Sequence, residues 1–160
     1  MTQNFLLLLD ISGSMYGENG EKILGMNQAV ESFIEGAKEI IPEPLLAIIT
    51  FGETIKMQDF YPLSQIAPKT YKAAGKSPLS EAVKLAGNTA TKDTITILIS
   101  DGAFNDSDYI KIPLLGEKYA IGIGADADHE QLSRFTGSTQ SVLPPHTAAD
   151  LPGYALARRR

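Results

Sequence analysis

The stretch that decides the fold spans residues 5–17 and reads FLLLLDISGSMYG. Its five consecutive apolar residues are too few to cross a bilayer, but they suit a strand buried on both faces. Asp10, Ser12 and Ser14 then follow at alternate positions. Because open parallel sheets bind ligands beyond the carboxyl ends of their strands, these three oxygen-bearing side chains can converge on one point there.

A cluster of oxygen ligands without cysteine or histidine suits a hard cation such as Mg²⁺ or Mn²⁺. Two of the three side chains are neutral hydroxyls, so a bound cation would keep much of its charge and could attract an anionic oxygen from outside. The alternative is that Asp10 and the two serines only shape the turn and cap the next helix, as these residue types often do. The motif by itself leaves both interpretations open.

Length and composition indicate one globular domain covering residues 1–160, with 43% hydrophobic and 21% charged residues. The chain has no cysteine, which excludes disulfides, thiolate metal sites and thiol catalysis. No positive charge precedes the first apolar run, so we predict no signal peptide, no membrane association and a cytoplasmic location. The net charge is −5 even with the terminal arginines 158–160, which argues against nucleic acid as a partner.

Hydrophobic periodicity predicts an alternation of strands and helices. Strands are expected at residues 5–9, 45–51, 54–63, 94–100, 118–123 and 141–143, and helices at residues 21–41, 77–89, 128–135 and 148–158. The half-polar pattern of residues 54–63 indicates an edge strand paired antiparallel to its predecessor. We therefore predict an α/β fold with a doubly wound, mostly parallel, Rossmann-like sheet and one antiparallel edge strand. In the first helix, Lys22 falls on the expected solvent face.

A second acidic group is expected near Asp10. The strand at residues 94–100 ends at Asp101, and neighbouring central strands would bring the two carboxylates together. They would repel each other unless a positive charge lay between them, and a divalent cation is the simplest candidate. The helix that begins near Ser77 would start on the same rim and add a hydroxyl.

Taken together, these motifs resemble the von Willebrand factor type A (vWA) domain family and its metal-ion-dependent adhesion site. The resemblance covers essentially the whole chain and rests on three motifs that occur in order: Asp10-Ile-Ser12-Gly-Ser14, Ser77-Pro78-Leu79 and Ser100-Asp101-Gly102. It implies that Ser12, Ser14 and Ser77 bind Mg²⁺ or Mn²⁺ directly, whereas Asp10 and Asp101 act directly or through water. A partner protein's Asp or Glu would supply the remaining ligand, so the resemblance implies protein binding and not an enzyme.

Two features depart from the family pattern. Ser77 stands where the family commonly has threonine; it keeps the hydroxyl but lacks the methyl group that stiffens the rotamer. The connection at residues 105–117 contains Pro113 and lacks the long amphipathic helix expected there. The compact chain resembles bacterial stand-alone members of the tellurium-resistance type.

The strongest enzymatic alternative is a Mg²⁺-dependent phosphatase or hydrolase with Asp10 as the nucleophile. That chemistry favours a second acid two residues later, where this chain has Ser12. A phosphate would also need a basic clamp, and Lys76 is the only base that the sequence predicts near the rim. Lys76 also belongs to a Gly-Lys-Ser triplet, but a Walker loop would need glycine where the chain has Thr70.

Overall fold

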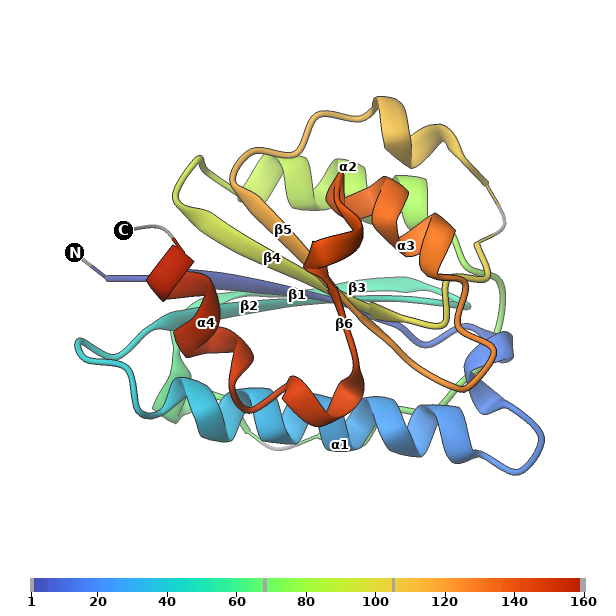
Figure 1. The fold of residues 1–160 in the computed structure, drawn as a ribbon, viewed down its shortest axis with the longest axis horizontal. Helices are drawn as coiled ribbons and strands as arrows, with labels where there is room; N and C mark the ends of the chain where they lie inside the picture. The colour runs from blue at the N-terminus through green and yellow to red at the C-terminus, as the bar shows by residue number, and fades with distance from the viewer. Residues whose placement is uncertain (1, 68, 105, 159–160) are drawn as a thin grey trace.

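The computed structural model describes residues 2–67, 69–104 and 106–158, which form one mixed sheet between two layers of helices (Figure 1). The strand order is β3-β2-β1-β4-β5-β6. The strands are β1 (Asn4–Asp10), β2 (Leu45–Phe51), β3 (Ile55–Pro62), β4 (Thr94–Ser100), β5 (Glu117–Gly122) and β6 (Val142–Leu143). The helices are α1 (Glu21–Ala37), α2 (Leu79–Thr89), α3 (His129–Thr136) and α4 (Leu151–Arg158).

Every neighbouring pair of strands is parallel except β2 and β3, which form an antiparallel hairpin. The predicted fold class, with its single antiparallel edge strand, is therefore confirmed. The half-polar sequence of β3 fits its place at the edge, since only one of its sides pairs with another strand.

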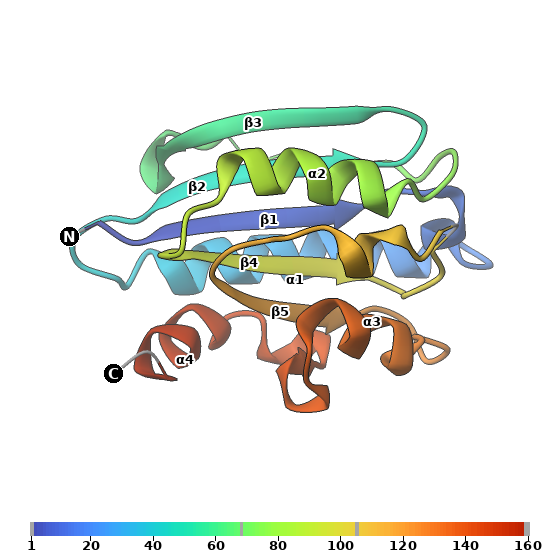
Figure 2. The ribbon, with the colours of Figure 1, turned by 90° about the horizontal axis from the view of Figure 1, so that it is seen from above.

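The central strand β1 is buried on both faces, as its unbroken apolar run predicts. Phe5, Leu7 and Leu9 join the core beneath α1 and α4, whereas Leu6 and Leu8 join the core beneath α2 and α3. Figure 2 shows α2 and α1 on opposite sides of the sheet. Because successive side chains of a strand point to opposite faces, one short segment organises both layers.

The order of the strands reverses direction at β1. The chain leaves β1 through α1 to reach β2 on one side, and it later returns through α2 to β4 on the other side. Ligands of doubly wound sheets bind at such a reversal, outside the carboxyl ends of the strands. Asp10 at the end of β1 and Asp101 just after β4 lie at this edge, which we call the rim.

Several element boundaries differ from the sequence prediction. α1 ends at Ala37 and not at residue 41, because residues 38–41 form turns ahead of Pro42. α2 starts at Leu79, so Ser77 stands in the preceding loop. α4 starts at Leu151 and not at residue 148.

The connection from β4 to β5 carries only the short 3₁₀ helix η3 (Asp108–Lys111) in its described part, which agrees with the predicted loss of a long helix. Asn105, Arg159 and Arg160, which entered the sequence predictions, lie outside the described residues. Among the helices that the structure describes, none has both the length and the apolar character needed to cross a bilayer.

Candidate functional site

The carboxylate of Asp10 occupies the centre of the rim and is fully buried. Its Oδ1 accepts the backbone N–H of Ser12 at 3.0 Å, and its Oδ2 accepts the Ser100 hydroxyl at 2.6 Å. The Ser77 hydroxyl donates to the same Oδ2 over a longer 3.5 Å. Three hydrogen-bond donors from three different segments therefore converge on one aspartate.

Burial raises the pKa of Asp10, since the charged carboxylate is removed from water. The hydrogen bonds from Ser100 and Ser12 oppose this rise by stabilising the anion, and the negative charge of Asp101 adds to it. Asp10 and Asp101 thus share one electrostatic environment, as predicted from their strands. A positive charge brought between them would be stabilised.

The first loop presents two hydroxyls side by side. Ser12 is buried and Ser14 is exposed, and their Oγ atoms lie 3.2 Å apart. The 3₁₀ helix η1 (Gly13–Tyr16) forms the turn between them. The backbone N–H of Gly13 donates to the carbonyl of Gly75 at 2.8 Å, which ties this loop to the one that carries Ser77.

The loop before α2 is fixed against both neighbouring loops. Ala74 donates its N–H to the carbonyl of Ile11 at 2.8 Å and accepts the N–H of Glu53 at 2.9 Å. Gly75 has a φ of +85°, and a Cβ at this position would lie 2.4 Å from the backbone nitrogen of Glu53. Only glycine fits this conformation at such close approach, and it sets the direction in which the chain continues to Ser77.

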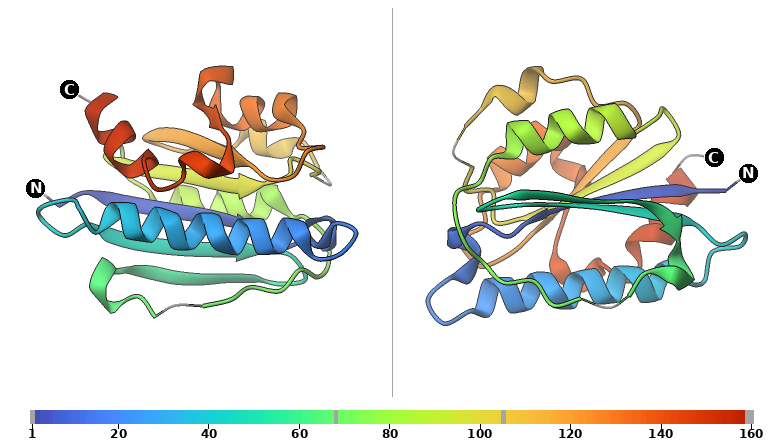
Figure 3. Two further views of the ribbon diagram at one scale, coloured as in Figure 1. Left: turned by 60° about the horizontal axis from the view of Figure 1, so that its bottom comes forward. Right: turned by 180° about the vertical axis from the view of Figure 1, so that it is seen from behind.

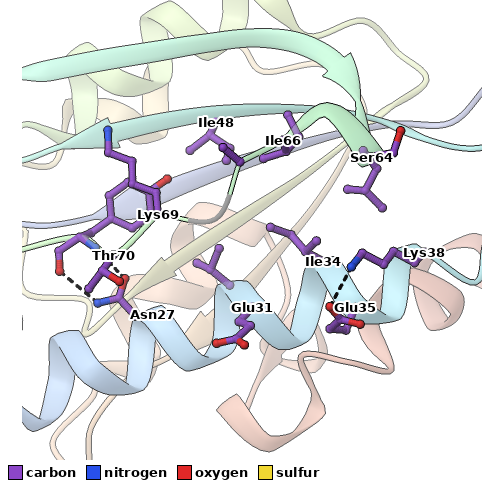
Figure 4. Close-up of a pocket in the computed structure, with 14 residues that line it drawn as sticks. Asn27, Glu31, Ile34, Glu35, Lys38, Ile48, Ser64, Ile66, Lys69 and Thr70 are labelled. Carbon is purple, nitrogen blue, oxygen red and sulfur yellow. Dashed lines mark hydrogen bonds and ion pairs between the residues drawn. The ribbon is translucent and has the colours of Figure 1, made fainter.

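Earlier in the chain than the Ser77 loop, the segment between β3 and α2 runs along α1 (Figure 3). The Asn27 side chain accepts the N–H of Tyr71 at 2.9 Å and donates to its carbonyl at 3.0 Å, so α1 holds this segment by two hydrogen bonds (Figure 4). A hollow of about 430 Å³ lies beside this contact, between α1 and the segment. None of the five predicted site residues lines it.

Asp101 is buried and held at both oxygens. Its Oδ1 accepts the backbone N–H of Ala103 at 3.0 Å, and its Oδ2 lies 3.3 Å from Nζ of Lys22. Lys22 also contacts Oδ1 of Asp126 at 2.9 Å. Burial lowers the pKa of Lys22, but its hydrogen bonds to Asp126 and Asp101 outweigh that effect and raise the pKa overall.

The position of Lys22 corrects two sequence predictions. Lys22 was expected on the solvent face of α1, yet its side chain is only 12% exposed. Lys76 was expected to be the only base near the rim, whereas Lys22 contacts a predicted site residue directly. The reason is that the first turn of α1 lies against the loops after β4 and β5. Helical periodicity alone does not reveal such a contact between separate elements.

Ser100 was also missed as a member of the site. It ends β4, is fully buried, and links Asp10 to the backbone N–H of Gly102, which donates to its hydroxyl at 3.0 Å. A signal was present, because a polar side chain at the end of a buried apolar strand needs a hydrogen-bond partner. His129 and His146 are exposed.

The structure gathers Asp10, Ser12, Ser14 and Ser77 through direct contacts and Asp101 through its charge. The five candidate metal ligands are two carboxylates and three hydroxyls. All are hard oxygen ligands, which suit Mg²⁺ or Mn²⁺ better than softer metals. In the described part of the chain, no group of three His, Cys, Asp or Glu side chains lies close enough together to hold a metal ion by itself. A cation here would therefore depend on the serines as well as on the two carboxylates.

The sequence matches no family model, and no curated protein is significantly similar to it. Solved structures are similar to it in fold. A von Willebrand factor type A protein from Catenulispora acidiphila aligns with a TM-score of 0.71 and 16% identity over 96% of this chain and 42% of that one. Manganese-loaded TRAP protein of Plasmodium vivax aligns with a TM-score of 0.72 and 17% identity over 94% of this chain and 71% of that one.

An aerotolerance-related membrane protein from Bacteroides fragilis aligns over 98% of this chain and 99% of that one, with a TM-score of 0.67 and 12% identity. Identities this low establish the fold alone. The strand order, the antiparallel edge hairpin and these alignments agree over nearly the whole chain. The chain therefore has the fold of the von Willebrand factor type A domain.

Proposed function

We propose that this chain is a protein-binding module whose rim uses a divalent cation to capture a carboxylate of a partner protein. Asp10, Ser12, Ser14, Ser77 and Asp101 would hold Mg²⁺ or Mn²⁺, and a partner's Asp or Glu would complete the site. The observation that carries the proposal is the buried Asp10 carboxylate, surrounded by serine hydroxyls and close to a second carboxylate at the reversal point of the sheet.

The charge balance of these residues favours binding of an acidic group. A bound divalent cation would supply two positive charges against the carboxylates of Asp10 and Asp101, and it can offer an open coordination position. The three serines contribute oxygen without negative charge, so they leave the site attractive to a further anion. A similarly folded protein, TRAP of Plasmodium vivax, has been solved loaded with manganese, which supports the class of cation proposed.

We propose binding and not catalysis. A phosphatase with Asp10 as nucleophile would need a basic group to hold the phosphate, and Lys22, the base that contacts Asp101 at the rim, is already paired with Asp101 and Asp126. Asp10 itself is buried beneath the hydroxyls of Ser77 and Ser100. We therefore expect no Mg²⁺-dependent turnover of a generic phosphate ester. Turnover that disappears in Asp10→Asn would instead favour the enzymatic alternative.

A direct test measures Mn²⁺ binding to the whole chain by titration calorimetry. We expect binding in the parent and a loss of at least about tenfold in affinity in Asp10→Ala and Ser14→Ala, because each removes an oxygen ligand. Asp150→Ala is a matched control, because it removes an aspartate that is not one of the proposed ligands. Asp150 is exposed and lies directly before α4, which packs on α1. Equal affinity in the parent and Asp10→Ala would exclude the proposed site.

Partner capture tests the second half of the proposal. The immobilised chain should retain partner proteins from a native lysate with Mg²⁺ present, and release them when a chelator is added. Asp101→Ala should retain none in either condition, while Asp150→Ala should behave like the parent. Retention that is indifferent to chelator would contradict a metal-dependent mechanism. The cytoplasmic location and the tellurium-resistance type stay predictions from the sequence.

A further inference from the structure

Lys22 occupies a slot formed by three separate segments of the chain. It extends from the first turn of α1, and its Nζ lies 3.3 Å from Oδ2 of Asp101 and 2.9 Å from Oδ1 of Asp126. Gly124, with a φ of +92°, leaves room for the lysine chain, because a Cβ there would lie 2.9 Å from Cε of Lys22. The ammonium group is thus held in one place, unlike a lysine extended into solvent.

The two carboxylates in this slot differ in exposure. The Asp101 side chain is 2% exposed and belongs to the proposed metal site, whereas the Asp126 side chain is 72% exposed and lies outside it. Lys22 therefore places one positive charge directly on a buried carboxylate that the divalent cation would also use. A second cation close to this ammonium is repelled by it.

We propose that Lys22 is a built-in counter-ion of the site, which pairs with Asp101 in the metal-free protein and lowers the affinity for the divalent cation. This inference rests on the proposed function and describes its regulation. Lys22 makes capture of the partner depend on the prevailing concentration of the metal, because a weakened site fills only when the cation is abundant. Asp126 moderates the effect by sharing the ammonium charge.

A purely structural role for Lys22 predicts a different result. A lysine that only tied α1 to the loops after β4 and β5 would position Asp101, so its loss would weaken metal binding. The counter-ion role predicts the opposite sign for Lys22 variants. It also predicts that loss of the Asp126 charge weakens metal binding. Without Asp126, less of the Lys22 ammonium charge is neutralised, so the ammonium repels a bound cation more strongly.

The experiment measures the affinity of the full chain for Mn²⁺ alone by titration calorimetry, in the parent and four variants. We expect about tenfold tighter binding in Lys22→Met and Lys22→Gln, the first of which keeps the apolar stem without the charge. We expect about twofold to threefold weaker binding in Asp126→Asn, since that exposed charge is partly screened by water. The double variant Lys22→Met with Asp126→Asn should match Lys22→Met, since the effect of Asp126 acts through the lysine.

Each outcome decides between the possibilities. Tighter binding in the Lys22 variants together with weaker binding in Asp126→Asn supports the counter-ion role. Unchanged or weaker binding in the Lys22 variants, while the parent binds Mn²⁺, overturns the role of Lys22 and leaves the proposed function standing. If neither the parent nor any variant binds Mn²⁺, both fail. If Lys22→Met does not fold, Lys22→Gln decides alone: tighter binding supports the role, and unchanged or weaker binding overturns it.

Discussion

Replacing Ser100 by alanine removes the shortest contact to the central carboxylate. The Ser100 hydroxyl donates to Asp10 at 2.6 Å and accepts the N–H of Gly102 at 3.0 Å, and all three residues are buried. Loss of a hydrogen bond to a charged group costs about 1.5–3 kcal/mol, and a buried N–H left without a partner costs about 1–3 kcal/mol. We therefore expect Ser100→Ala to lower the free energy of unfolding by about 3 kcal/mol.

The assay is urea unfolding followed by circular dichroism, with chelator present so that metal binding does not contribute to stability. In a chain of this length, a loss of about 3 kcal/mol corresponds to a fall of about 6–12 °C in the midpoint of thermal unfolding. Thermal scans of the same samples provide a second measure of the same loss.

Thr96→Val is a control in the same strand. Thr96 is fully buried, and its Oγ1 makes no hydrogen bond to any described group. Valine has nearly the same shape, so we expect this variant to be unchanged or more stable by up to about 1 kcal/mol. A loss below about 1 kcal/mol in Ser100→Ala, or equal losses in both variants, would refute the role assigned to Ser100.

Three further predictions concern other parts of the molecule. Gly75→Ala should lose more stability in urea unfolding than Gly137→Ala. Both glycines have positive φ, but of the two only Gly75 has backbone atoms where the new Cβ would lie. Equal losses would contradict the close packing of the loops. Asn27→Ala should speed hydrogen exchange of the Tyr71 amide by about tenfold without changing that of β4, since two hydrogen bonds are lost; unchanged exchange at Tyr71 would contradict it. Burial, together with a hydrogen bond to a glutamate, raises the pKa of Tyr119 from 10.0 to about 12, so the folded chain keeps a proton that the unfolded chain releases. The free energy of unfolding should therefore fall as the pH rises from 10 to 12, and it should fall less in Tyr119→Phe. Urea unfolding at each pH measures this, and equal slopes of the free energy against pH in both proteins would contradict it.

The fold could be predicted from the sequence because buried strands and edge strands differ in their pattern of apolar residues. The unbroken apolar run in β1 and the apolar, β-branched run in β4 predict central strands, while the alternation in β3 predicts an edge. Once these strands are ordered, the rim follows, because the carboxyl ends of parallel strands share one edge of the sheet. This is why Asp10 and Asp101 could be placed near each other in advance.

The parts of the site that the sequence did not reveal depend on how separate elements meet. Periodicity assigned Lys22 to solvent because it considers one helix at a time, whereas the structure places the loops after β4 and β5 beside that helix. The motif that contains Ser100 does not show that its hydroxyl reaches Asp10 on the neighbouring strand. Both contacts join residues more than seventy positions apart.

The distances in the rim separate residues that support the site from residues proposed to hold the cation. The supporting groups make short contacts: Ser100 reaches Asp10 at 2.6 Å, and backbone N–H groups reach the Asp10 and Asp101 carboxylates at 3.0 Å. The printed contacts of the serine hydroxyls proposed to bind the cation are longer, at 3.2 Å between Ser12 and Ser14 and 3.5 Å between Ser77 and Asp10.

This difference has a consequence for how the two groups of residues should respond to mutation. Loss of the Ser14 hydroxyl should alter metal affinity more than stability, because this side chain is exposed and its contact with Ser12 is long. Changes at the supporting residues should alter stability in chelator and affinity together, because they fix the position of the carboxylates that a cation would meet. If Ser14→Ala destabilised the metal-free chain as much as Ser100→Ala, the division between support and ligand would be wrong.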